Sequence, residues 1–110
     1  MPTMTEPSRL HVRVLDLGEM TIVGLDGSMD QTNARQVGEQ LHRAVERDST
    51  TIVLDCSLLR TLGRTGVAVL ADALDDIRDH DGRLVVRQPN PQARHLLAED
   101  GLLDEIEIED

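Results

Sequence analysis

The chain has 110 residues, with 21 acidic and 11 basic side chains and a net charge of −10, and this length indicates one domain. The acidic balance disfavours DNA, RNA and acidic membrane surfaces as partners, because binding them depends on clustered Lys and Arg. Phe, Tyr and Trp are absent, so the chain has no base-stacking platforms and its core has to be aliphatic. It shows no N-terminal apolar segment and no long apolar run, and we therefore expect a soluble, cytoplasmic protein.

Two strands with a tight connection are predicted near the start of the domain. Residues 1–9 carry two prolines and no pattern, which predicts a flexible tail ahead of a domain at residues 10–110. Apolar residues then alternate on both sides of Gly18, which is typical of a β-hairpin. We expect the second strand to end at Gly27.

An amphipathic helix and a buried strand come next. Thr32 or Asn33 is predicted to cap the helix. The predicted core face of this helix consists of Ala34, Val37, Leu41, Ala44 and Val45. Thr51–Leu54 is a short apolar run, typical of a central strand covered on both faces, and we expect Asp55 to close it.

Helices and strands continue to alternate in the second half of the chain. Apolar residues recur at helical spacing from Val67 to Ile77, and Leu84–Val86 predicts another buried strand. Pro91 suits the first position of a short helix that Gly101 ends. The last strand alternates isoleucines with glutamates, and its acidic face discourages edge-to-edge pairing.

The predicted order is β-β-α-β-α-β-α-β, which indicates an α/β fold. We expect a single domain with a mixed sheet of about five strands, in which an opening hairpin is followed by β-α units. The alternation implies parallel neighbours with right-handed crossovers. We expect the helices to pack mainly on one face of the sheet.

No set of side chains indicates metal binding or a reactive thiol. The four histidines are His11, His42, His80 and His95. They form no recognised ligand motif, so we expect surface or boundary histidines, no metal and no other cofactor. Cys56 has no basic neighbour in the sequence and is interpreted as a half-buried structural cysteine.

Three carboxylates stand near the predicted strand ends. Asp26, Asp30 and Asp55 would lie at the edge where open parallel sheets bind ligands. A catalytic pair would need two of them to converge in a cleft. Turn and capping roles are favoured over catalysis, and we expect no enzymatic activity.

The segment Gly63–Gly66, with the sequence GRTG, stands between the central strand and the next helix. Its glycines are too close together for a Walker loop, and the lysine of that motif is missing. The helix start still offers free N–H groups to an anion, and Arg64 adds a positive charge. The alternative is a tight turn with its glycines at positive φ.

Taken in order, several short motifs indicate a family. They are Gly27–Asp30, Ile52–Asp55, Gly63–Gly66, Leu84–Val86, Asn90-Pro91 and Gly101-Leu102. This series resembles the STAS domain, and more narrowly the bacterial anti-sigma factor antagonists, over about residues 10–108. In that family a kinase-type anti-sigma factor binds the loop at the start of the second helix, which frees a sigma factor. Phosphorylation of the first serine of that loop adds a charge of about −1.5 to −2 and breaks the complex.

This sequence departs from the family pattern at the phosphoacceptor. Family members usually read Asp-Ser-Ser-Gly or Asp-Ser-Thr-Gly, whereas Gly63 stands here for the aspartate and Arg64 for the first serine. Ser28 likewise replaces the glutamate of the family's Gly-Glu-Leu-Asp motif. Because Arg64 cannot accept phosphate, the resemblance implies a partner-switching regulator without the usual serine switch. Thr65 is left as an alternative acceptor, although its family counterpart has mostly a structural role.

The resemblance implies a partner-binding surface that both loops contribute. Its expected residues are Ser28, Asp30, Gln31, Gly63, Arg64, Thr65 and Gly66. Two other functions stay open. One is a module that binds a small anionic ligand, such as a nucleotide, at the Gly63–Gly66 loop. The other is a scaffold role in a larger assembly, for instance through a weak homodimer.

Overall fold

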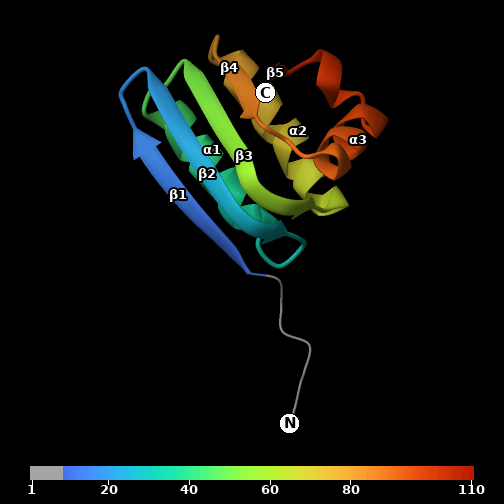
Figure 1. The fold of residues 1–110 in the computed structure, drawn as a ribbon. Helices are drawn as coiled ribbons and strands as arrows, with labels where there is room; N and C mark the ends of the chain where they lie inside the picture. Colours follow the sequence, from blue (N-terminus) through green and yellow to red (C-terminus); the bar gives the residue numbers. More distant parts are fainter. Residues whose placement is uncertain (1–8) are drawn as a thin grey trace.

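A five-stranded sheet with the order β1-β2-β3-β4-β5 forms the centre of the computed structural model, which describes residues 9–110 (Figure 1). The strands are β1 (Leu10–Asp16), β2 (Met20–Met29), β3 (Thr51–Leu62), β4 (Arg83–Arg87) and β5 (Glu107–Glu109). The helices are α1 (Ala34–Glu46), α2 (Arg64–Asp79), α3 (Pro91–Glu99) and the short 3-10 helix η1 (Leu102–Asp104). β1 is antiparallel to β2 and the other neighbours are parallel, which confirms the predicted mixed α/β sheet.

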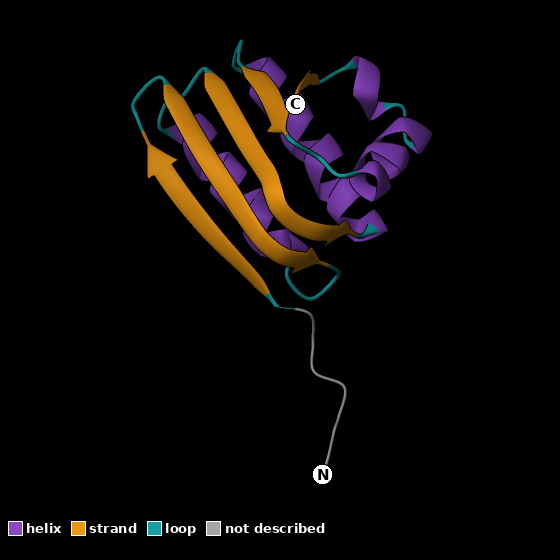
Figure 2. Ribbon diagram, viewed as in Figure 1, coloured by secondary structure: helices purple, strands orange, loops and turns teal. Residues whose placement is uncertain are grey.

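The helices lie on one side of this sheet. In Figure 2, α1 and α2 lie behind the sheet, and α3 lies beside the lower end of β3. The core between these layers is aliphatic and includes Ile52 and Leu54 of β3 and Leu84 and Val86 of β4. Val53 alternates with its buried neighbours and points to the face opposite the helices. The expected position of the helices on one face is therefore confirmed.

The core face of α1 matches the amphipathic pattern. Its buried residues are Ala34, Val37, Leu41, Ala44 and Val45. The hairpin between β1 and β2 also forms at Gly18, whose φ of 85° is in the left-handed region that favours glycine. The predicted tail at residues 1–9 lies outside the described residues, apart from Arg9, whose carbonyl accepts a hydrogen bond from Ser28 N at 3.0 Å.

Two strands run further than the sequence predicts. β2 does not end at Gly27 but continues to Met29, because its pairing with β3 resumes after an irregularity at Gly27, whose φ is 124°. β3 does not close at Asp55 but continues to Leu62. The register between β2 and β3 shifts twice along this extension, and such bulges bend a strand without ending it. The bend of β3 is visible in Figure 1.

Arginines from three elements bind the acidic side chains of the C-terminal segment. The pairs are Arg78–Glu105 at 2.7 Å, Arg83–Glu107 at 2.8 Å, Arg94–Asp110 at 2.6 Å, and Arg87–Glu109. The alternating glutamates of β5 thus have a bonding role that the sequence pattern does not indicate.

No helix among residues 9–110 has the length and apolar character needed to span a bilayer.

Candidate functional site

Two loops meet at the carboxyl ends of β2 and β3. The strands are parallel neighbours, with Met29 opposite Leu62 at their ends. Immediately after this pair, Gly63 N donates a hydrogen bond to Met29 O at 3.0 Å. The loop after β2 and the loop after β3, which are predicted to share one surface, therefore lie in direct contact.

Short-range hydrogen bonds fix the loop between β2 and α1. Asp30 Oδ1 accepts hydrogen bonds from both the backbone N and the hydroxyl of Thr32. Asn33 stands at the N-cap position, as predicted, but its side chain does not cap α1. Its Oδ1 accepts instead from Asp30 N at 2.9 Å, and its Nδ2 donates to Ser28 O at 3.0 Å. The loop is thus held in one conformation by its own side chains.

The glycines of the GRTG segment are required by close packing. The expectation of positive φ is wrong, because Gly63 has a φ of −86° and Gly66 lies in the first turn of α2. A Cβ on Gly66 would lie 2.5 Å from Met29 Sδ and 2.8 Å from Leu62 Cδ1. A Cβ on Gly63 would lie 3.0 Å from Met29 O. The absence of side chains lets the start of α2 approach the end of β2.

Arg64 is the first residue of α2 and extends away from the loops. Its side chain is 81% exposed, and its Nη2 lies 3.5 Å from Glu99 Oε1 on α3. It folds onto neither Asp30 nor Asp55. His95 Nε2 lies 3.2 Å from the other carboxylate oxygen of Glu99, so this acid lies between two basic side chains. The first turn of α2 has no acidic residue and no side-chain cap that would offset the arginine.

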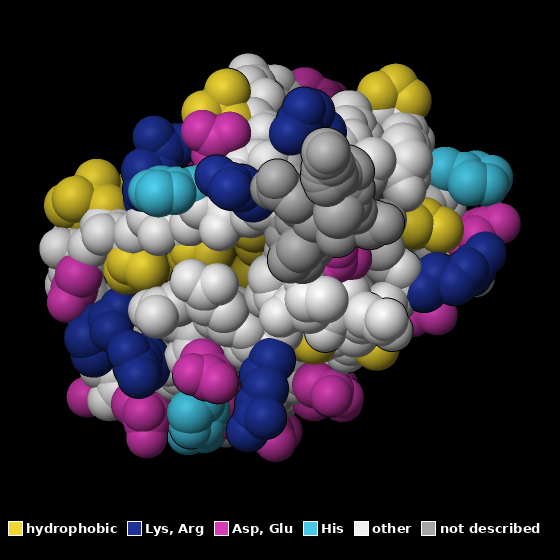
Figure 3. Space-filling model, turned by 90° about the horizontal axis from the view of Figure 1, so that it is seen from below, with side chains coloured by type: hydrophobic (Ala, Val, Ile, Leu, Met, Phe, Trp, Pro, Cys, Tyr) yellow, Lys and Arg dark blue, Asp and Glu magenta, His cyan; other side chains and the backbone are white. Residues whose placement is uncertain are grey.

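The seven predicted site residues differ in accessibility. Gln31, Arg64 and Thr65 are exposed, and Ser28, Asp30 and Gly63 are partly buried. Gly66 is buried, so it supports the surface and offers nothing to a partner. Seen from the end where β2 and β3 terminate, basic and acidic side chains are interspersed over the visible surface (Figure 3).

Side-chain amides at the start of α3 hold the end of β3. Gln92 exchanges two hydrogen bonds with the backbone of Leu62, each 2.8 Å long. Asn90 Nδ2 donates to the carbonyls of Leu59 and Arg60. Neither contact can be predicted from the sequence, because the Asn-Pro pair indicates only a helix start. Asn90 has that role as well, since its Oδ1 accepts from Ala93 N.

The other polar candidates lie apart from the two loops. With the strands longer than predicted, Asp26 and Asp55 lie within β2 and β3, so only Asp30 stands at a strand end. Cys56 is more deeply buried than expected, with 4% exposure, and this burial raises the pKa of its thiol to about 12. It is therefore a neutral core residue at physiological pH.

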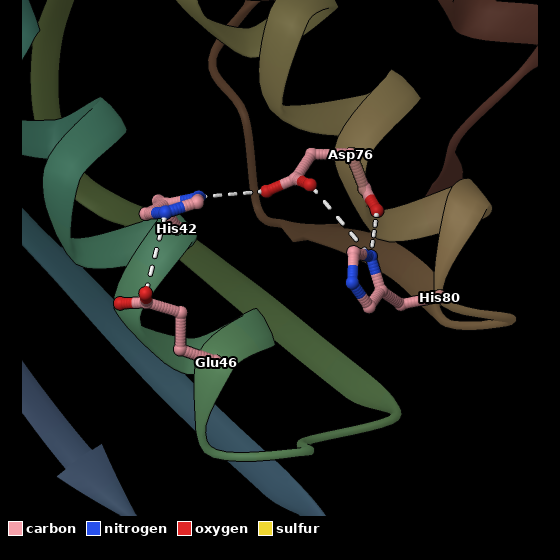
Figure 4. Close-up of polar contacts among 4 residues, drawn as sticks. All are labelled: His42, Glu46, Asp76 and His80. Atoms are coloured by element: carbon pink, nitrogen blue, oxygen red, sulfur yellow. Dashed lines mark hydrogen bonds and ion pairs between the residues drawn. The ribbon is translucent and has the colours of Figure 1, made fainter.

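All four histidines are exposed, as expected for surface residues. Two of them approach one carboxylate on α2 (Figure 4). His42 Nδ1 lies 2.9 Å from Asp76 Oδ2, and His80 Nδ1 lies 3.7 Å from Asp76 Oδ1. Within residues 9–110 these contacts do not amount to a group that could hold a metal ion.

A groove of about 630 Å³ lies between α1 and α2 and includes neither loop. A cavity of about 120 Å³ lies beside Arg64, between α2 and α3. Two carboxylates, from Glu99 and Asp100, line this smaller cavity. The surroundings of Arg64 are therefore poorly suited to a small anion.

The family model of the STAS domain matches residues 11–110, and the chain belongs to this family. Comparison with curated proteins gives no match. Among solved structures, an anti-sigma factor antagonist from Mycobacterium paratuberculosis is 21% identical, with a TM-score of 0.82, and the alignment covers 96% of this chain and 90% of that one.

Two further solved structures are similar to this chain. Unphosphorylated SpoIIAA, an anti-sigma factor antagonist, is 18% identical with a TM-score of 0.77, covering 93% of this chain and 89% of its own. A serine-to-glutamate variant of RsbS from Moorella thermoacetica is 22% identical with a TM-score of 0.73, covering 88% and 84%. At these identities the likeness establishes the shared fold.

Proposed function

We propose that this protein is an anti-sigma factor antagonist that works in the cytoplasm without enzymatic activity. It binds a kinase-type anti-sigma factor through the two loops at the ends of β2 and β3, and binding releases a sigma factor. The exposed side chain of Arg64 at the start of α2 is the observation that carries this proposal. It places a permanent cation where the family has its phosphoacceptor serine, so the usual serine switch is missing.

Three observations support the partner-binding role. The chain is a STAS domain over nearly its whole length, and similar solved structures are named as anti-sigma factor antagonists. The two loops touch through the Gly63–Met29 hydrogen bond and form one surface. Three residues of that surface, Gln31, Arg64 and Thr65, are exposed and can contact a partner.

A small anionic ligand at the Gly63–Gly66 loop is the weaker alternative. Arg64 and the start of α2 would attract an anion. However, the cavity beside Arg64 is lined by Glu99 and Asp100, and Glu99 already approaches the guanidinium. We therefore favour a protein partner at this surface.

The docking proposal is tested with charge reversals at matched positions. Candidate kinase-type anti-sigma factors are immobilised, and the affinities of wild type, Arg64→Glu and Arg43→Glu are compared. Arg43 is also exposed but lies about 13 Å along α1 from the helix start. We expect Arg64→Glu to weaken binding at least about tenfold, because it reverses a charge inside the interface. Equal affinity of all three proteins would place the interface elsewhere.

The missing switch is tested by restoring the acceptor. Arg64→Ser is incubated with the anti-sigma factor and ATP, beside the wild type and Thr65→Ala, and intact masses are measured. We expect a gain of about 80 Da, the mass of one phosphoryl group, for Arg64→Ser alone. Phosphorylation of the wild type that disappears in Thr65→Ala would show instead that Thr65 has taken over as the acceptor.

A further inference from the structure

The end of β3 extends beyond its neighbour β4. Pairing with β4 covers only Thr51–Asp55, whereas pairing with β2 continues to Leu62. Among the described residues, no strand lies along the β4 side of the last part of β3. A strand held along one edge only would open easily, and this strand carries the Gly63–Gly66 loop.

Side-chain amides take the place of the missing strand. Gln92 Oε1 accepts a hydrogen bond from Leu62 N at 2.8 Å, and Gln92 Nε2 donates to Leu62 O at 2.8 Å. A glutamine amide has the same donor and acceptor as a peptide group. Gln92 therefore pairs with Leu62 as a residue of a neighbouring strand would, and Asn90 extends this pairing to the carbonyls of Leu59 and Arg60.

Leu62 transmits this restraint to the start of α2. It precedes Gly63, whose N–H binds Met29 O and whose carbonyl accepts from Val67 N at 3.1 Å. Its side chain is 2% exposed and packs against Gly66, leaving no room for a Cβ there. A displacement of the Leu62 backbone thus shifts both the first hydrogen bond of α2 and the packing beneath its first turn.

We propose that Gln92 is a positioning residue for the partner-binding surface, and this rests on the proposed function. Gln92 holds the end of β3, and through it Gly63 and Arg64, in a single arrangement before the partner binds. A preformed surface loses less conformational entropy on binding, so Gln92 raises the affinity for the partner. Gln92 is exposed and outside the core. The stability of the whole domain therefore depends on Gln92 far less than the position of the Gly63–Gly66 loop does.

Hydrogen exchange on the full chain tests the restraint without any partner. Gln92→Met keeps the size and removes both hydrogen bonds, and Gln36→Met makes the same change at an exposed glutamine of α1. In Gln92→Met we expect the amides of Gly63 and Val67 to exchange about tenfold faster, while Ile52 and Leu54 keep their rates. Unchanged rates at Gly63 and Val67, or an equal increase at all four amides, would overturn the proposal.

Affinity measurements with the partner test whether the hydrogen bonds of Gln92 strengthen binding. We expect Gln92→Met to bind the anti-sigma factor captured by wild type about tenfold more weakly, and Gln36→Met to bind it like wild type. Unchanged affinity of Gln92→Met would contradict the positioning role, even where exchange is faster. If wild type captures no anti-sigma factor, the proposed function fails, and the exchange rates alone still decide whether Gln92 fixes the loop.

Discussion

Thr21 and Ser49 are buried polar side chains that join two turns of the chain. Their hydroxyl oxygens lie 2.6 Å apart, and Ser49 Oγ donates to Gly18 O at 2.7 Å. Because the single hydroxyl proton of Ser49 is used on Gly18, Thr21 is the donor between the two hydroxyls. This chain of hydrogen bonds links the β1–β2 turn to the segment that leads into β3.

Removing Ser49 leaves the fully buried hydroxyl of Thr21 without its partner. We expect Ser49→Ala to lower the free energy of unfolding by about 1–3 kcal/mol in urea titrations. Thr21→Val is expected to cost less, because Ser49 keeps its bond to Gly18. The double variant should lose less than the sum of the two single losses, since it leaves no orphaned hydroxyl. Strict additivity would contradict the hydrogen-bond chain.

Among the helices, α1 and α2 are joined by an ion pair whose strength depends on pH. The hydrogen bond to Asp76, followed by the charge of Glu46, raises the pKa of His42 above its ordinary value of 6.5. The imidazole of His80 also approaches Asp76, with Nδ1 2.9 Å from its backbone carbonyl oxygen (Figure 4). The charged form of His42 is therefore favoured in the folded chain more than in the unfolded chain.

The stabilisation from His42 is fully present below about pH 6.5 and is lost as the pH rises through the raised pKa of the folded state. We therefore expect the advantage of wild type over His42→Gln in unfolding free energy to be larger at about pH 6 than at about pH 8. In Asp76→Asn, NMR titration should show the pKa of His42 returning toward its ordinary value. An advantage that grows with pH would contradict the pairing.

Exposed charge pairs contribute to holding β5 at the edge of the sheet. The strand has three residues, and Ile108 is only partly buried. Raising the NaCl concentration from about 0.05 M to about 0.5 M screens exposed ion pairs. We expect faster hydrogen exchange within Glu107–Glu109 and little change in Ile52–Leu54. Arg83→Gln should show the faster exchange already at low salt, whereas Arg43→Gln, at a site without such a pair to β5, should not.

The whole molecule should respond to salt in the opposite direction from β5. With 21 acidic and 11 basic residues, the folded chain repels itself, and screening relieves that repulsion. The same increase in NaCl is expected to raise the thermal midpoint, and a gain of about 1 kcal/mol corresponds to about 4–8 °C in a domain of this size. Differential scanning calorimetry measures this shift. A falling midpoint would mean that the ion pairs outweigh the net charge.

The sequence predicted the fold well because its periodic patterns are local. The core face of α1 and the hairpin at Gly18 follow from the spacing of apolar residues along the sequence. The true end of β3 could not be predicted, because it is set by contacts with distant parts of the sequence: pairing with β2, and hydrogen bonds from Gln92 and Asn90. The need for glycine at position 66 could not be predicted either. It arises from close contact with Met29, which is distant in the sequence, and not from a local backbone conformation.

For the candidate site, the sequence predicted which residues lie near one another at the ends of β2 and β3. It did not predict the directions of their side chains. Both loops were expected on one surface because they follow parallel strands. The direction of Arg64, toward Glu99 on α3, depends on how α3 packs and has no local signal. Asp55 was expected at the end of β3, but it lies inside this strand, because β3 continues to Leu62 through contacts that have no local signal.

The bond between Gln92 and Leu62 also has a consequence for the order of events during synthesis. The Gly63–Gly66 loop leaves the ribosome before α3, and Gln92 follows it by roughly thirty residues. At about 5–20 residues per second, this interval lasts a few seconds. A nascent chain that contains both loops but not yet Gln92 therefore lacks the contact that fixes them, and we expect it to bind the partner more weakly until α3 has been made.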